Sequence, residues 1–219
     1  FDKKVVSIDA SKNAARVDCE DGSSYSANKI ICSLPFSVLK DIPIYPIIDG
    51  PQSDAIQSLK SQKINMLHLI PKTPYWETDQ MSPNMYTDQL AGMILAQRQA
   101  SSPEIVDSLT VWLRGPIAEK LDRMNQGDAI RSVIKSIETL RPSTKGQLEF
   151  AAYHSWSLNP YSNGDWAYWG PGQIKAFGQE ISKPHHGIHF CGEHTAIANR
   201  GMEGALESGE RVFFEILGI

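Results

Sequence analysis

The sequence predicts an α/β fold, because strand-like and helix-like segments alternate along its 219 residues. The first forty residues contain three segments rich in β-branched side chains, which predict strands at 4–9, 15–20 and 29–35. Residues 127–140 carry apolar side chains at the three- and four-residue spacing of an amphipathic helix, and Pro142 ends that pattern. A strand predicted at 187–193 runs into a helix-forming segment at the end of the chain.

The elements between these landmarks follow from local composition. Turn residues at 10–13 and 21–24 separate the first three strands and predict hairpins. The apolar run at 30–34 predicts a strand buried on both faces. The proline-rich passage 41–51 predicts a linker or a domain crossing. The remaining predicted segments are a helix at 53–60, strands at 63–70, 109–115 and 149–156, and an aromatic, glycine-rich loop at 159–173.

The bulk composition is that of an ordinary globular protein, with 41% apolar and 21% charged residues. The net charge of -4 offers no electrostatic attraction to nucleic acid or to an anionic membrane. No apolar run approaches the roughly 18 residues that a membrane-spanning helix needs. We therefore expect no nucleic-acid partner and no membrane segment.

The cysteines and histidines predict neither a disulfide framework nor a metal site. Cys19, Cys32 and Cys191 are odd in number, far apart in the sequence and set among apolar neighbours. They are typical of core residues in a reducing compartment, and with no signal peptide they predict a cytoplasmic location. His185 and His186 are adjacent, and no carboxylate or cysteine stands at ligand spacing from them, so we expect a polar turn there and no metal.

Residues 192–217 raise a question, because a helix-forming segment carries glycine at positions 201, 204 and 209. Each glycine inside a helix costs about 1 kcal/mol relative to alanine, which is tolerated where another group must approach the backbone. The segment follows a strand, so its first N–H groups lie where open α/β sheets bind ligands and attract negative charge. Either a ligand contacts this small-residue face or another backbone packs on it. The apolar packing is expected from Met202, Leu206, Phe213, Ile216 and Leu217.

Four segments, in the same order along the chain, resemble the flavin-containing amine oxidase superfamily, which includes monoamine, polyamine and L-amino-acid oxidases. "GEHTA…RGMEGALESGERVFFEIL" is similar to its C-terminal flavin-contacting motif, and "VVSID…EDGSSYSANKIICSLPFSVL" to the strands that return towards the adenine end of FAD. "MLHLIPKTPYWE" resembles a substrate-domain strand that ends in an aromatic pair. "NPYSNGDWAYWGPGQ" resembles the loop that places an aromatic wall beside the flavin ring.

The resemblance implies the C-terminal half of a two-domain FAD-dependent amine oxidase fold. Residues 1–52 and 156–219 would form part of a Rossmann-like FAD-binding domain, and residues 53–155 part of a substrate-binding domain with a mixed sheet. The superfamily begins with a strand, a G-x-G-x-x-G loop and a helix that hold the FAD pyrophosphate, and this sequence has no such segment. We therefore expect a longer polypeptide, whose missing N-terminal half is the partner that this chain needs to bind FAD.

Six residues are implied to contact FAD, through the adenine, the flavin ring or the ribityl chain: Val5, Gly192, Glu193, Gly201, Met202 and Glu203. Backbone N–H groups at the start of the last helix would stabilise negative charge on the reduced ring. A helix-capping carboxylate at Glu193 and a core side chain at Val5 fit the same pattern. Valine in place of Gly201 or Gly204 is expected to abolish flavin binding with little loss of fold, because its methyl groups would occupy the space of the ring.

Three residues are implied to bind the substrate. Trp166 stands where the superfamily places one aromatic ring of the cage that flanks the substrate amine. Tyr168 is expected to line the same pocket, unless its neighbour Trp169 faces inward instead. Arg200 would attract a substrate carboxylate, and a solvated surface arginine fits its position equally well. The alternative for the three aromatic residues of this segment, Trp166, Tyr168 and Trp169, is that they lie in the core or at its rim.

Two positions depart from the superfamily pattern. The lysine that holds a water at flavin N5 in many members corresponds to Met66, and Lys63 replaces it only with a shift of three residues. The cysteine that attaches FAD covalently in some members corresponds to Asp165, so non-covalent FAD is expected. Trp166 and Met66 are thus the residues implied at the catalytic centre.

The resemblance implies that the intact protein oxidises an amine to an imine, which hydrolyses to a carbonyl compound and ammonia or a smaller amine. Dioxygen would reoxidise the flavin and leave as hydrogen peroxide. Two alternatives stay open. One is an L-amino-acid oxidase, whose substrate carboxylate needs an arginine, and the other is a non-catalytic binding module with an amine-oxidase-like fold.

Overall fold

A computed structural model describes residues 1–11 and 14–218, and it divides into two compact units. Unit 1 comprises Phe1–Ser61 and Trp166–Ile219, and unit 2 comprises Gln62–Asp165. The expected boundaries at 52/53 and 155/156 lie nine or ten residues away from the observed ones. The reason is local packing: helix α2 (Gly50–Ser58) packs against α1 (Phe36–Leu39) and α6 (Gln173–Phe177), so its residues belong to unit 1.

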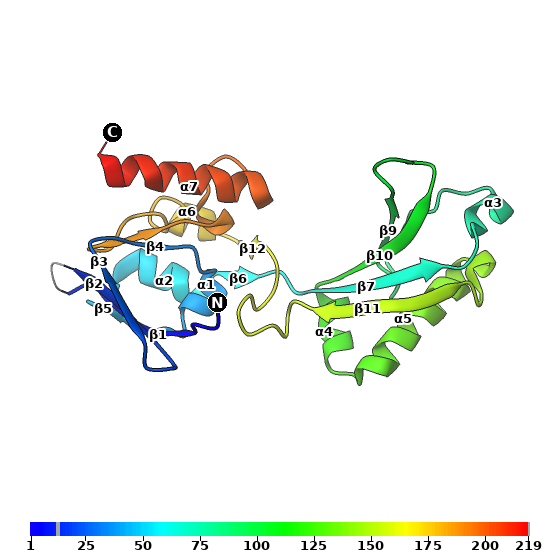
Figure 1. Cartoon of the computed structure of the whole chain (residues 1–219), viewed down its shortest axis with the longest axis horizontal. Coiled ribbons are helices and arrows are strands. Elements are labelled where there is room, and N and C mark those ends of the chain that lie inside the picture. The colour runs from blue at the N-terminus through cyan, green and yellow to red at the C-terminus, as the bar shows by residue number, and fades with distance from the viewer. Residues whose placement is uncertain (12–13, 219) are drawn as a thin grey trace. The chain divides into compact units, whose positions relative to one another are not determined.

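Unit 1 contains three small sheets with helices packed around them (Figure 1). The first has the order β3-β2-β1-β5, with β1 (Val5–Asp9) and β2 (Ala15–Cys19) antiparallel as the turn residues predict. Lys12 and Asn13 of the predicted 10–13 turn lie outside the described residues. The other strands of this sheet are β3 (Ser24–Ala27) and β5 (Ile44–Tyr45).

The two other sheets of unit 1 are two-stranded and carry the candidate site. β13 (Ile188–Phe190) pairs in parallel with β4 (Ile30–Cys32), and β12 (Ala167–Tyr168) pairs antiparallel with β6 (Lys60–Ser61). The short helix η2 (Glu193–Thr195) and the long helix α7 (Gly201–Leu217) follow β13.

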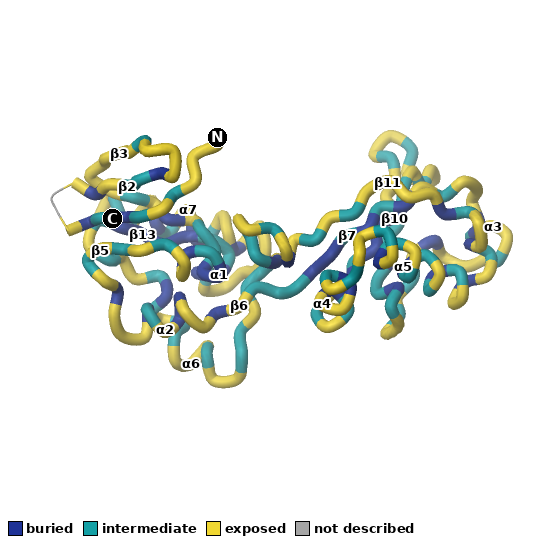
Figure 2. Tube along the Cα trace, turned by 90° about the horizontal axis from the view of Figure 1, so that it is seen from below, coloured by how far each residue is buried: buried dark blue, intermediate teal, exposed yellow. Residues whose placement is uncertain are grey.

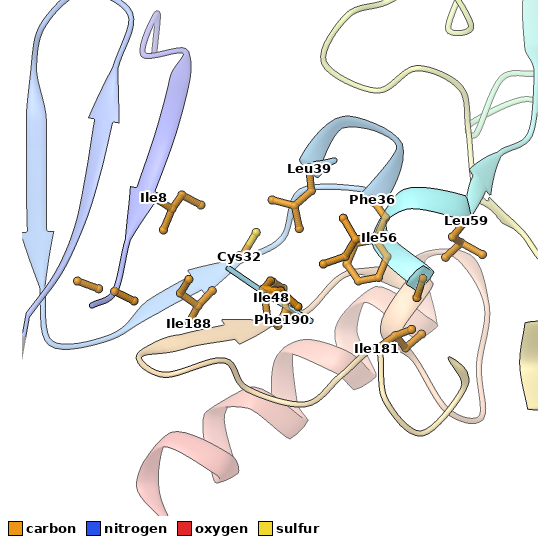
Figure 3. Close-up of a cluster of buried hydrophobic side chains, with 13 residues drawn as sticks. Ile8, Cys32, Phe36, Leu39, Ile48, Ile56, Leu59, Ile181, Ile188 and Phe190 are labelled. Atoms are coloured by element: carbon orange, nitrogen blue, oxygen red, sulfur yellow. The ribbon is translucent and has the colours of Figure 1, made fainter. Parts of the chain in front are cut away.

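The core of unit 1 lies between these sheets and the short helices (Figure 3). Ile8, Phe36 and Phe190 are nearly fully buried there, and the rings of Phe36 and Phe190 meet edge to face. Two expectations for this unit are wrong. The passage 41–51 is no domain crossing, because it contributes β5 and then enters α2. Ile31 is 56% exposed, so β4 is not buried on both faces, since it pairs only with β13 in the described chain.

Unit 2 is one five-stranded sheet covered by helices (Figure 1). Its strand order is β11-β7-β10-β9-β8, and every described pair is antiparallel, so the mixed pairing expected of this unit appears only in unit 1. The strands are β7 (Ile64–Pro71), β8 (Met85–Tyr86), β9 (Met93–Arg98), β10 (Val106–Arg114) and β11 (Leu148–Ser155).

One face of this sheet forms the core of unit 2. Alternate residues of β7 and β10, among them Leu67, Leu109 and Val111, are buried against Val133 and Ile137 of helix α5 (Gln126–Leu140). Figure 2 shows the resulting buried stretch of β7. The helices α3 (Tyr75–Asp79), α4 (Pro116–Asp122) and η1 (Pro142–Thr144) complete the unit.

A buried ion pair joins two of these helices. The Arg141 guanidinium donates to both carboxylate oxygens of Asp79, at 2.7 and 2.8 Å, and lies over the Tyr75 ring. Its side chain is only 5% exposed, so the pair is shielded from solvent. Arg141 therefore holds α3 against η1 within unit 2.

Candidate functional site

The turn that follows β13 is built by the chain's own side chains. Gly192 has a φ of +114°, and a Cβ placed there would lie 2.7 Å from the His194 ring. Its N–H donates to Ser208 Oγ at 2.8 Å, so it is satisfied within unit 1. His194 packs against Phe36, and burial lowers the pKa of its imidazole to about 4, which keeps the ring neutral at neutral pH. Glycine at 192 is thus required by this turn whether or not a ligand is present.

Glu193 connects this turn to the aromatic segment. Its Oε2 accepts a hydrogen bond from the Ala167 N–H at 3.0 Å, so it does not cap the last helix. Ala167 and Trp169 pack against the core of unit 1. Because side chains alternate along a strand, Tyr168 lies on the other face of β12, where it is 55% exposed, and Trp166 directly precedes this strand. The structure thus brings Glu193 beside the two expected cage residues.

The loop before α7 is held by a carboxylate that the sequence analysis did not single out. Glu207 accepts hydrogen bonds from the N–H groups of Ile197, Ala198 and Asn199 at 2.7 to 3.1 Å. These bonds, with that of Ile197 first, lower the pKa of Glu207 to about 2. Glu207 lies within α7, one turn beyond Glu203, so the helix fixes the loop that leads into its own first residue. No pattern in the sequence distinguishes Glu207 from the other surface glutamates.

The head of α7 is open. Arg200 occupies the N-cap position without a capping side-chain bond, and no described residue accepts from the N–H groups of Gly201, Met202 and Glu203. Gly201 has a φ of +61°, and a Cβ built there meets no atom within 4 Å. Unpaired N–H groups at the start of a helix attract negative charge. This part of the site is therefore polar, unobstructed and formed by backbone.

The three glycines of α7 have different surroundings. A Cβ on Gly204 would lie 2.8 Å from the Asn199 carbonyl oxygen and 3.1 Å from Ala196 Cβ, whereas Gly209 has nothing within 4 Å. The close neighbour of Gly204 is therefore the chain's own loop. The expectation that valine at position 204 would leave the fold nearly intact is wrong, because that loop is held in place by Glu207.

The apolar side of α7 is exposed, contrary to expectation. Gly204, Ser208 and Val212 are buried against unit 1, but the apolar positions expected to pack are largely open. The exposed ones are Met202 (85%), Leu206 (69%), Phe213 (55%) and Leu217 (55%). A helix in a globular protein normally buries such a stripe, so this face of α7 has no covering element within the described chain.

The remaining predicted residue of unit 1 is Val5, at the start of β1. It is half-buried, pairs with Cys19 and packs against the core of the unit. These contacts are those of a core side chain, and its backbone role towards a nucleotide stays a prediction. Arg200, in contrast, is exposed beside the open head of α7.

Met66 belongs to unit 2, where the structure shows a partner that was not anticipated. Met66 Sδ accepts from Trp156 Nε1 at 3.4 Å, and Trp156 in turn meets the His154 ring edge to face. Lys63 Nζ donates to Asn163 Oδ1 at 3.2 Å, so within unit 2 its side chain contacts the loop 159–173. Trp156 was missed because it lies at the boundary of a predicted strand and loop. It directly follows β11, and the contact depends on how that strand pairs with β7.

The sequence analysis expected neither a metal site at the histidines nor a membrane-spanning helix. Within residues 1–11 and 14–218, no three histidine, cysteine or acidic side chains gather as metal ligands. His185 Nε2 instead donates to the Pro46 carbonyl at 2.7 Å, as in a structural turn. No described helix has the length and apolar character to cross a bilayer.

The comparison with known proteins decides the family. Residues 1–213 match the family model for flavin containing amine oxidoreductases. The chain belongs to this family. Flavin-containing amine oxidase B of Homo sapiens is 24% identical to it, covering 99% of this chain and 42% of that protein. The L-amino-acid oxidase of Vipera ammodytes ammodytes is 21% identical, covering 95% and 45% respectively.

The solved structures of the family share the fold. Cyclohexylamine oxidase from Brevibacterium oxydans IH-35A superposes with a TM-score of 0.83 at 14% identity, over 100% of this chain and 49% of that one. This likeness confirms the α/β class expected for the C-terminal half of an amine oxidase fold. The chain spans about half the length of the relatives that it matches.

Proposed function

We propose that this chain forms part of an FAD-dependent amine oxidase, completed by an N-terminal half that supplies the dinucleotide-binding loop. The observation that carries the proposal is the head of α7, where three backbone N–H groups have no acceptor among the described residues and a Cβ on Gly201 would meet no atom within 4 Å. The exposed apolar stripe of the same helix supports it, because a large covering partner is needed to bury that stripe.

The residues at this head fit a flavin. The flavin ring is flat, carries carbonyl and nitrogen acceptors, and becomes more negative when reduced. The N–H groups of Gly201, Met202 and Glu203 would donate to those acceptors, and the positive end of the helix dipole favours the negative charge. A side chain at position 201 would obstruct this approach, and at a φ of +61° it would also be strained.

FAD would supply the redox chemistry when bound, as the acceptor of a hydride from the carbon that bears the amine. The chain's own residues bind and orient the substrate. Trp166 and Tyr168 would form an aromatic wall that confines an apolar amine and excludes water, and the hydrogen bond from Ala167 to Glu193 fixes their segment to the turn. Met66 has no proton to give or take, so it contributes packing and soft polarisable contact only.

We further propose that FAD is bound without a covalent link. Asp165 occupies the place where some relatives carry the linking cysteine. The described cysteines, Cys19, Cys32 and Cys191, are buried, and burial raises the pKa of the Cys32 and Cys191 thiols, which keeps both in the unreactive form.

A second candidate activity is L-amino-acid oxidation, and one observation favours it. The Arg200 side chain is exposed directly before the open head of α7 and forms no ion pair with any described residue. An arginine in that setting binds a carboxylate well, because its guanidinium donates in a bidentate fork. The non-catalytic alternative predicts flavin binding without turnover.

The test is reconstitution of the chain with an N-terminal half that carries the dinucleotide-binding loop. Our proposal predicts a yellow complex with the flavin absorption band, loss of the flavin on acid precipitation, and peroxide release with amines. A complex that releases peroxide only with amino acids would support the second candidate. A complex that binds flavin but is not reduced by any amine or amino acid would support the non-catalytic module, and absence of a yellow complex would contradict all three.

A further inference from the structure

A cavity of about 460 Å³ lies within unit 2, between the C-terminal end of α4 and the end of β11. Its size is within the range of small-molecule sites. Asp122 is the one acidic residue among its described lining residues, and no lysine or arginine lines it. The wall of the cavity therefore has one carboxylate and no lysine or arginine, and its one imidazole is that of His154.

Hydrogen bonds fix the position of the Asp122 carboxylate, but only one of its two oxygens accepts them from described residues. Its Oδ1 accepts from Ser155 Oγ at 2.8 Å and from Asn65 Nδ2 at 3.0 Å, whereas no described residue donates to its Oδ2. No described basic side chain lies within ion-pair distance of it. Asp122 is also the last residue of α4, where the negative end of the helix dipole disfavours a carboxylate. A bound cation would relieve both effects.

The polar groups next to Asp122 are uncharged and leave one buried acceptor without a donor. Asn65 is fully buried, and its Oδ1 accepts no hydrogen bond from a described residue. Tyr153 OH accepts from Asn65 Nδ2 at 2.8 Å. Burial, and then the charge of Asp122, raise the pKa of the Tyr153 phenol, which therefore stays protonated at neutral pH. The network thus contributes no positive charge of its own.

The rest of the wall suits an organic body more than a bare metal ion. Leu121 and Met124 line one part of the cavity, and Leu158 (66% exposed) and Tyr161 (65% exposed) line another. A metal ion would require several oxygen ligands, and only one carboxylate is present here. Apolar and aromatic groups around one carboxylate are instead typical of a site for an organic ammonium ion.

We propose that this cavity binds a small primary amine, whose ammonium group donates to Asp122 Oδ2 while its apolar body contacts Leu158 and Tyr161. His154 lines the cavity and also meets the Trp156 ring, so it is the one residue shared with the contact between Met66 and Trp156. Asn65 and Met66 are neighbours on β7, so they point to opposite faces of the sheet. The proposal goes beyond the flavin-dependent activity and needs no flavin.

The test measures binding of 2-phenylethylamine to the full chain by titration calorimetry at about pH 8, where the amine is an ammonium ion. The uncharged isostere 2-phenylethanol is the matched ligand. We expect Asp122→Asn to weaken amine binding by about tenfold or more, since a charge-assisted hydrogen bond is lost. Asp88→Asn, at an exposed position away from the cavity, is the matched control and should leave binding unchanged.

Two further variants keep the test decisive. Leu158→Trp fills the cavity mouth without changing charge, so it should weaken binding even where Asp122→Asn fails to fold. Trp166→Ala should leave this binding intact. Equal affinity for the alcohol and the amine, equal affinity of Asp122→Asn and the unmodified chain, or no binding at all would overturn the proposal. Loss of binding in Trp166→Ala alone would overturn it too, while supporting an amine site beside the proposed flavin position.

Discussion

Gly204 gives the sharpest test of how α7 is built. A Cβ there would lie 2.8 Å from the Asn199 carbonyl oxygen, closer than real Cβ contacts occur. Overpacking of this kind costs about 1–3 kcal/mol. The Asn199 backbone cannot yield easily, because its N–H is held by Glu207 at 2.9 Å. Gly204→Ala should therefore destabilise unit 1, despite the gain of about 1 kcal/mol that alanine brings to a helix.

Gly209→Ala is the matched control. It brings the same helix-propensity gain, and its Cβ meets no atom within 4 Å. The difference between the free energies of unfolding of the two variants therefore contains the overpacking cost without the propensity effect. We expect Gly209→Ala to be the more stable by about 1–3 kcal/mol. Unfolding in urea, monitored through the hydrogen exchange of residues 187–217, measures this difference. Equal stability of the two variants would refute the close approach between α7 and its preceding loop.

The remaining predictions concern a loop, a buried ion pair and the proposed cage. Glu207 has its pKa lowered from 4.5 to about 2, so its stabilising effect is present above about pH 4.5 and is lost as pH falls towards 2. The protection of the three loop amides, measured against their intrinsic exchange rate at each pH, should fall over that window, and Glu207→Gln should remove this dependence. Arg141→Lys should lower the melting temperature of unit 2, because its bidentate pair with Asp79 is buried, whereas Arg131→Lys on the surface should have little effect. Trp166→Ala should raise KM for the amine in the reconstituted enzyme without releasing FAD, and release of FAD would show that the ring is placed wrongly.

Local patterns predicted most of the regular structure. The β-branched runs at 4–9 and 15–20 correspond to β1 and β2, and the apolar periodicity at 127–140 corresponds to α5 (Gln126–Leu140). Among the elements that were not anticipated are α1, α3, α6, β8, β9 and α4. The seven residues of α4 are too few to display a clear period.

The candidate site could be predicted only in part. The strand, turn and helix at the end of the chain follow from their composition, and so does the importance of glycine there. Which neighbour each glycine meets depends on tertiary contacts: Gly204 meets the loop at Asn199, and Gly201 meets nothing. The same holds for Glu207 and Trp156, whose partners lie 8 to 90 residues away in sequence. Side-chain alternation alone did not decide between Tyr168 and Trp169 until the core contact of Trp169 was known.

The most direct test of the central claim is amide hydrogen exchange at Gly201, Met202 and Glu203. These N–H groups have no acceptor in the described chain, so they should exchange rapidly in the chain alone. In the reconstituted protein, adding FAD should slow their exchange by about tenfold or more, because the cofactor accepts hydrogen bonds from them. Bound FAD with unchanged exchange at these three amides would contradict the claim that the head of α7 contacts the flavin.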